Sequence, residues 1–169
     1  MRVLAIDPGY ERLGIAVVES ALPKERVLCS NCLRTSSKDT FPSRLKQIGL
    51  EIERLLTLYQ PDAVALEQLF FNTNQKTAMR VAEVRGALLY IAHKADIPTY
   101  EYTPLQVKIA VLGYGRGEKK QVIDMVERLV DLPKISRLDD EYDAIAIGLT
   151  CLAIEKNFLH SVLKSRNMA

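Results

Sequence analysis

Two short, uninterrupted apolar runs, residues 3–6 and 63–66, each end in a carboxylate, at Asp7 and Glu67. Such a run is typical of a strand that is buried on both faces, as in a parallel sheet covered by helices. Ligands of these sheets bind beyond the carboxyl ends of the strands, so the two acids would converge if the two strands are parallel neighbours. Either acid alone has an ordinary explanation, because strand ends often carry polar residues where they reach water.

The remaining segments predict a mixed α/β fold. Residues 2–7, 13–19 and 26–35 form three strands joined by short turns, which indicates an antiparallel meander. A helix then begins near Thr40, a suitable N-cap, and ends before Pro61. Further strands are expected at residues 63–67 and 97–102, and further helices at 74–95, 104–111, 119–130 and 140–155. This order predicts a five-stranded mixed sheet with helices on both faces. We expect one domain, residues 1–157, and a mobile tail, residues 158–169.

Length and charge limit the possible classes of protein. A chain of 169 residues suits one domain, and its net charge is only +2. Between Gln68 and Lys120, however, eight lysines and arginines stand against four acidic residues, a bias compatible with phosphate contacts. No apolar run is long enough for a membrane span, and the one at the N-terminus is too short for a signal peptide, so a cytoplasmic protein is expected. The Cys29-x-x-Cys32 pair has no second pair to complete a zinc site.

A second pair of carboxylates opens the last predicted helix. Asp140 and Asp143 are three residues apart, which places them on one face of its first turn. Acidic residues there also stabilise a helix through its dipole and by capping. The apolar run that follows, residues 144–149, indicates a buried helix, so these carboxylates need counter-charge, which metal ions supply. Four carboxylates on three elements suit hard divalent cations and the two-metal displacement of a phosphodiester.

Several short motifs carry a family resemblance. They are Ile6-Asp7-Pro8-Gly9 with Gly14, Pro42-Ser43-Arg44-Leu45, Glu67-Gln68-Leu69-Phe70 with Asn74, Ala78, Arg85 and Gly86, Gln106-Val107-Lys108, residues 113–122, and residues 140–146. Each motif alone is weakly specific. In this order and at these spacings the chain resembles the RuvC family of Holliday-junction resolvases from residue 3 to about residue 153. The resemblance implies an RNase H-like fold and a magnesium-dependent DNA endonuclease.

The resemblance also implies roles for individual residues. Asp7, Glu67, Asp140 and Asp143 would be catalytic carboxylates that bind two Mg²⁺ ions, or Mn²⁺ in their place. Lys119, and with it Lys108, would act near the scissile phosphate. The partners implied are four-way junction DNA, a second copy of the chain in a homodimer, and a branch-migration helicase complex.

Contacts to DNA are expected from five further residues. Phe70 resembles a family aromatic that stacks on an opened base, although packing at the start of a helix explains it equally well. Backbone contacts are assigned to Lys76, Arg80, Arg116 and Lys120, with ordinary surface charge as the alternative. Two features depart from the family. Tyr142 stands where a small residue is usual, and Asp139 precedes Asp140, so the third ligand is either of these two.

Three rival functions remain open at this point. A YqgF-like nuclease of the same fold would act on RNA rather than on a DNA junction. A junction-binding module without catalysis would not need the four carboxylates. Half of an actin-like ATPase shares the Asp-x-Gly motif, but 169 residues are too few for two domains that clasp a nucleotide.

Overall fold

A six-stranded mixed sheet forms the centre of the structure. The computed structural model describes residues 1–68, 75–132 and 136–166, with residues 75–77 and 156–166 described by their backbone only. The strands lie in the order β5-β4-β1-β2-β3-β6. Their bounds are β1 Arg2–Asp7, β2 Arg12–Glu19, β3 Glu25–Arg34, β4 Ala63–Glu67, β5 Thr99–Tyr102 and β6 Val130–Asp131.

The strand pairing confirms the predicted meander and the predicted parallel neighbours. β1 pairs antiparallel with β2, and β2 pairs antiparallel with β3. On the other side β1 pairs in parallel with β4, and β4 pairs in parallel with β5. The strands that end in Asp7 and Glu67 are therefore adjacent and point the same way.

The sheet has one strand more than the five expected from the sequence. β6 has only two residues, and it pairs in parallel with Glu25 and Arg26 at the start of β3. The sequence prediction assigned Val130 to the end of a helix, which in fact ends at Leu129. A strand of two residues has no detectable alternation, so only its pairing with β3 defines it.

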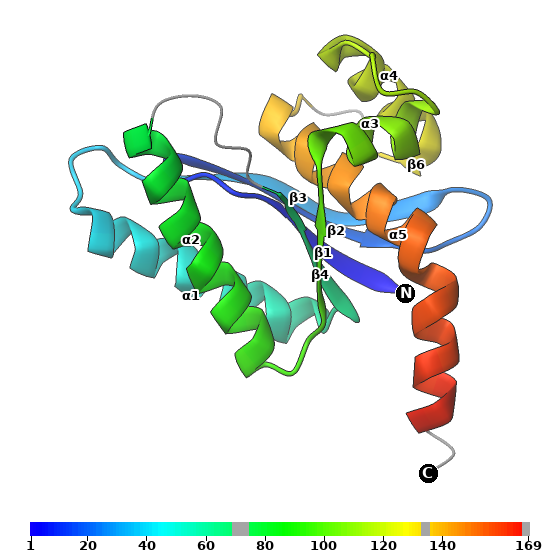
Figure 1. The fold of residues 1–169 in the computed structure, drawn as a ribbon, viewed down its shortest axis with the longest axis horizontal. Helices are drawn as coiled ribbons and strands as arrows, with labels where there is room; N and C mark the ends of the chain where they lie inside the picture. The colour runs from blue at the N-terminus through cyan, green and yellow to red at the C-terminus, as the bar shows by residue number, and fades with distance from the viewer. Residues whose placement is uncertain (69–74, 133–135, 167–169) are drawn as a thin grey trace.

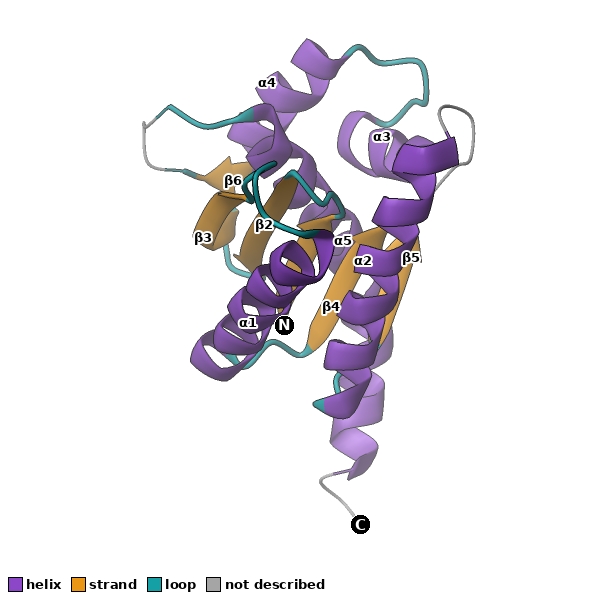
Figure 2. Ribbon diagram, turned by 90° about the vertical axis from the view of Figure 1, so that its left-hand side faces the viewer, coloured by secondary structure: helices purple, strands orange, loops and turns teal. Residues whose placement is uncertain are grey.

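In the described part of the chain, five helices cover the two faces of the sheet. They are α1 Phe41–Tyr59, α2 Gln75–Lys94, α3 Pro104–Leu112, α4 Lys119–Leu129 and α5 Asp139–Arg166. Helices α1 and α2 lie on one face, and α3, α4 and α5 lie on the other (Figure 1). Figure 2 shows α1 and α2 in front of the strands. A mixed sheet with helices on both faces is the architecture predicted from the sequence.

Each face of the sheet has its own apolar core, and the two-residue period of the strands divides the residues between them. Leu4, Ile6 and Leu66 pack with α1 and α2. Ala5 and Ala65 belong to the core under α5. Asp7 and Glu67 stand two residues beyond these alanines. The alternation therefore turns both carboxylates towards the face that α5 covers.

Helix ends follow local sequence signals where such signals exist. Thr40 caps α1 as predicted, with its side chain accepting a hydrogen bond from the Ser43 backbone N–H. Helix α5 runs on to Arg166, whereas its predicted end was near Glu155. The division into a domain and a mobile tail stays a prediction.

Within the described residues no helix is both long and apolar enough to cross a membrane. The cytoplasmic location also stays a prediction.

Candidate active site

The carboxylates of β1 and β4 are neighbours at the carboxyl ends of these two inner strands. Ile6 is paired with Leu66 in the parallel register of these strands, and Asp7 and Glu67 each follow by one residue. Adjacent strands lie about 4.8 Å apart, so the two side chains leave the sheet side by side. Within the described residues neither side chain has a hydrogen bond or an ion pair.

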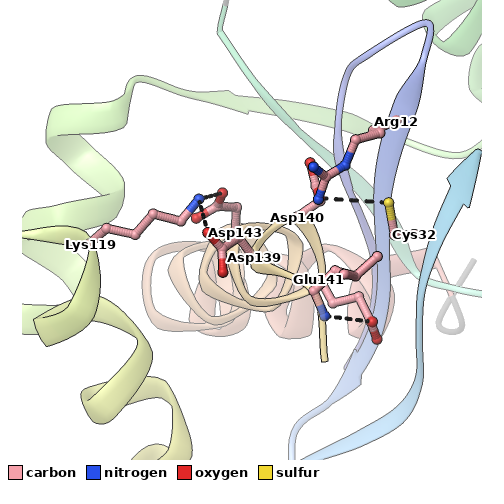
Figure 3. Close-up of polar contacts among 8 residues, drawn as sticks. Arg12, Cys32, Lys119, Asp139, Asp140, Glu141 and Asp143 are labelled. Atoms are coloured by element: carbon pink, nitrogen blue, oxygen red, sulfur yellow. Dashed lines mark hydrogen bonds and ion pairs between the residues drawn. The ribbon is translucent and has the colours of Figure 1, made fainter. Parts of the chain in front are cut away.

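The first turn of α5 adds acidic side chains above these strand ends. The Arg12 guanidinium at the start of β2 donates a hydrogen bond to Oδ2 of Asp140. The Lys119 Nζ at the start of α4 lies 2.9 Å from Oδ2 of Asp143 and 3.4 Å from Oδ2 of Asp139. Figure 3 shows Arg12 and Lys119 approaching this turn from different sides. Each candidate ligand on α5 is thus paired with a cation of the protein.

Electrostatic interactions connect the carboxylates into one site. Burial, together with the charges of Glu67, Asp143 and Asp140, raises the pKa of Asp7 to about 7, and the charge of Lys119 opposes this rise. Burial and the charge of Asp143 also raise the pKa of Glu67. The charge of Asp140, but not that of Asp139, contributes to the raised pKa of Asp7, and the Asp139 side chain is 63% exposed against 20% for Asp140. The geometry therefore favours Asp140 over Asp139 as the third candidate ligand beside Asp7 and Glu67.

The site has the chemical character of a site for hard divalent cations. Its donors are carboxylate oxygens, and the ion pairs of Arg12 and Lys119 are formed with acids on α5. In the described part of the chain no three acidic, histidine or cysteine side chains are grouped as closely as the ligands of one ion. In this conformation Asp140 and Asp143 are bound to Arg12 and Lys119 instead. The residues fit a cation, which would compete with Arg12 and Lys119 for Oδ2 of Asp140 and Asp143.

A cavity of about 280 Å³ opens beside the carboxylates. Val107, Val122 and Ile147, from α3, α4 and α5, line its apolar part. Its charged part holds two acids and two lysines, namely Glu67, Asp143, Lys108 and Lys119. The two lysines predicted to act near the scissile phosphate are thus in the same cavity as two of the predicted metal ligands.

The predicted DNA contacts are less closely gathered. Arg116 and Lys120 are exposed on the segment that leads into α4 and on its first turn. Arg80 lies on α2, where it forms an ion pair of 3.0 Å with Glu83 and stacks 4.2 Å from the ring centre of Phe41. Phe70 and the side chain of Lys76 lie outside the described residues. The DNA contacts stay predictions, and Arg80 already has protein partners.

Several supporting contacts had no signal in the sequence analysis. Glu141 accepts hydrogen bonds from Ser30 on β3 at 2.7 Å and from the Leu138 backbone N–H at 3.1 Å. The Tyr142 hydroxyl donates to Glu127 on α4 at 2.7 Å. These contacts hold the acidic turn to both of its neighbours. Tyr142 and Glu127 are 15 residues apart in the chain, and Ser30 and Glu141 are 111 residues apart. No local sequence pattern therefore predicts either contact.

This arrangement defines a class of protein. The acidic residues gather where the central parallel strands of a mixed sheet end, and the first turn of the last helix completes the cluster. That is the layout of an RNase H-like nuclease.

Comparison with known proteins identifies the family. The family described as "Crossover junction endodeoxyribonuclease RuvC" matches residues 3–151. The relative from Alkaliphilus metalliredigens is 48% identical over 88% of this chain and 91% of its own. The relative from Thermosipho melanesiensis is 45% identical over 94% of this chain and 100% of its own. The chain belongs to the crossover junction endodeoxyribonuclease RuvC family, and the resemblance inferred from its motifs is confirmed.

The fold agrees with a solved member of this family. The structure of Thermus thermophilus RuvC in complex with Holliday junction substrate superposes with a TM-score of 0.87 and 34% sequence identity. The match covers 94% of this chain and 97% of the Thermus chain. The similarity therefore extends over most of the chain, and the predicted RNase H-like fold class is confirmed.

Proposed function

We propose that this chain resolves four-way DNA junctions by hydrolysing one phosphodiester in each of two opposed strands. The observation that carries the proposal is the convergence of Asp7, Glu67, Asp140 and Asp143 from three separate elements at one edge of the sheet. The family match and the similarity to a structure that contains a Holliday junction support the substrate. This activity serves recombination and repair of DNA.

The same four carboxylates would hold two Mg²⁺ ions, or Mn²⁺ in their place. The bound cations would supply an activated water for attack and stabilise charge on the leaving 3′ oxygen. The four side chains would hold both ions in one site, where the negative carboxylates offset the repulsion between the two cations. Burial and then the charges of Glu67, Asp143 and Asp140 raise the pKa of Asp7, as expected for buried acids gathered for a cation.

Lysines would manage the charge of the DNA phosphate. Lys119 lies 2.9 Å from Asp143, and Lys108 lines the same cavity. When Asp143 binds a cation, Lys119 becomes available to a phosphate oxygen at the same place. Exposed Arg116 and Lys120 would extend this positive surface along the DNA backbone, so junction affinity should fall steeply as salt rises.

A homodimer would place two such sites on one junction. A four-way junction has approximate two-fold symmetry, and a closed dimer presents two identical sites related by a two-fold axis. Paired nicks then follow from symmetry. A branch-migration helicase complex is the further partner that the family implies.

The decisive experiment incubates the protein with a synthetic four-way junction and Mg²⁺, beside a linear duplex and RNA. We expect symmetric nicks in the junction alone and none with the folded Asp7→Asn variant. Binding of the junction without nicking, in Mg²⁺ and in Mn²⁺, would support the non-catalytic module instead. Preference for RNA would support the YqgF-like alternative. Sedimentation of the same samples would test the dimer.

A further inference from the structure

Arg12 binds a candidate metal ligand of the active site, although it belongs to none of the motifs that the family resemblance rests on. It opens β2, five residues beyond Asp7, and its guanidinium donates to Oδ2 of Asp140. The Cys32 thiol donates to the same oxygen at 3.7 Å (Figure 3). One oxygen of Asp140 is thus approached by two donors of the protein itself.

The exposure of the two partners shows which of them is able to move. The Arg12 side chain is 48% exposed, whereas the Asp140 side chain is only 20% exposed. Asp140 is fixed in the first turn of α5, where Glu141 ties that turn to Ser30 on β3. Arg12 can swing into solvent without unpacking any part of the core. Ion pairs with an exposed partner are weak, so other charged groups can displace them.

A metal ion and Arg12 compete for the same position. Both are cations, and a guanidinium that donates to Oδ2 of Asp140 blocks that oxygen and repels a divalent ion beside it. Guanidinium groups also bind phosphate well through paired hydrogen bonds. A DNA phosphate that enters the site would therefore attract Arg12 away from Asp140.

We propose that Arg12 is a cation gate on the active site: it occupies Asp140 in the DNA-free protein and moves to a DNA phosphate when substrate binds. Departure of Arg12 opens Asp140 to the divalent cation. The inference rests on the proposed metal-dependent function and adds that loading of the metal depends on substrate. Because such coupling is reciprocal, DNA strengthens metal binding and metal strengthens DNA binding.

The first test measures Mn²⁺ affinity without DNA, from the electron paramagnetic resonance signal of free Mn²⁺. The Arg12→Gln variant should bind Mn²⁺ roughly two- to fivefold more tightly than the unmodified protein, the range expected from the loss of one exposed ion pair. Arg12→Lys retains the charge and should behave like the unmodified protein. Arg26→Gln is the matched control. Arg12 is paired with Arg34 at one end of β3, whereas Arg26 is exposed near the other end of that strand.

The second test compares this affinity with the Mn²⁺ concentration that half-saturates single-turnover cleavage of the junction. In the unmodified protein, the Mn²⁺ concentration that half-saturates cleavage should be lower than the Mn²⁺ dissociation constant measured without DNA. The ratio of these two values should be closer to one in Arg12→Gln. Unchanged or weaker DNA-free binding by Arg12→Gln would overturn the gate. If Arg12→Gln shows the same ratio between these two values as the unmodified protein, DNA does not open the Arg12 gate. If Mn²⁺ supports no cleavage of the junction at any concentration, the proposed metal-dependent function fails instead.

Discussion

Gly14 of β2 lies directly against the backbone of Asp140: a Cβ built on Gly14 would stand 2.1 Å from the Asp140 carbonyl oxygen. Gly14 is also the partner of Asp7 in the antiparallel register of β1 and β2. The absence of a side chain at this position lets the first turn of α5 descend onto the sheet beside Asp7. The proximity of the strand carboxylates to those of α5 thus depends on one glycine.

Substitution of this glycine should damage both the fold and the site. Gly14→Ala forces the start of α5 away from β2, and such overpacking costs about 1–3 kcal/mol of unfolding free energy. Displacement of the catalytic groups by about 1 Å is enough to slow cleavage on the order of 100-fold. Urea unfolding and single-turnover cleavage of a junction would measure the two effects. Gly86→Ala is the control, since a Cβ there meets nothing within 4 Å and α2 should gain up to about 1 kcal/mol. Equal behaviour of the two variants would contradict this account.

Asp7 should destabilise the metal-free protein above neutral pH. Its pKa is about 7 in the folded protein against 3.8 for an unperturbed group, so both states are protonated below pH 4 and the folded state carries the full cost of the buried charge above pH 7. Metal-free Asp7→Asn should therefore be more stable than the unmodified protein at pH 8, by roughly 4 kcal/mol, with the difference disappearing towards pH 4.

Thermal unfolding in a chelator across this pH range would test the prediction for Asp7. Asp124→Asn, at an exposed position on α4, controls for the change in net charge. Mg²⁺ should reduce the advantage of Asp7→Asn, because the cation stabilises the ionised carboxylate. A stability difference independent of pH would show that the charge of Asp7 is not the cause.

Lys119 should affect the rate of cleavage more than the affinity for DNA. It touches both Asp143 and Asp139 and lines the cavity beside Glu67. Loss of one group that stabilises developing charge typically costs about 100-fold in rate. Lys119→Ala should show a loss of this order in single-turnover cleavage, with a much smaller change in the junction dissociation constant. Lys120→Ala should mainly weaken binding, and a normal cleavage rate for Lys119→Ala would make Lys119 an ordinary surface residue.

Tyr142 should contribute to stability by joining α5 to α4. Its ring is buried, and its hydroxyl donates a hydrogen bond of 2.7 Å to Glu127. Tyr142→Phe removes only this bond and should lower the free energy of unfolding by about 1 kcal/mol. Tyr114→Phe, at a side chain that is largely exposed, should have no effect in the same urea titration. An equal loss in both variants would argue against a bond specific to Tyr142 and Glu127.

Much of this structure is predictable from the sequence because its signals are local. The apolar runs before Asp7 and Glu67 predict buried parallel strands, and strand alternation turns both acids to one face of the sheet. The Thr40 cap and the helical period likewise indicate where α1 begins. The motifs, taken in order and at their spacings, are specific enough to indicate the family, and the family match confirms it.

Only the tertiary structure decided how the site is held together. Arg12 and Asp140 are separated by 128 residues, and Ser30 and Glu141 by 111. Neither pair leaves a trace in the periodicity or the local composition of the chain. The two-residue strand β6 exists only through its pairing with β3. Sequence patterns report which face of an element is buried and where the element ends. Contacts between side chains depend on how the elements pack, and here the close approach of α5 to Gly14 determines that packing.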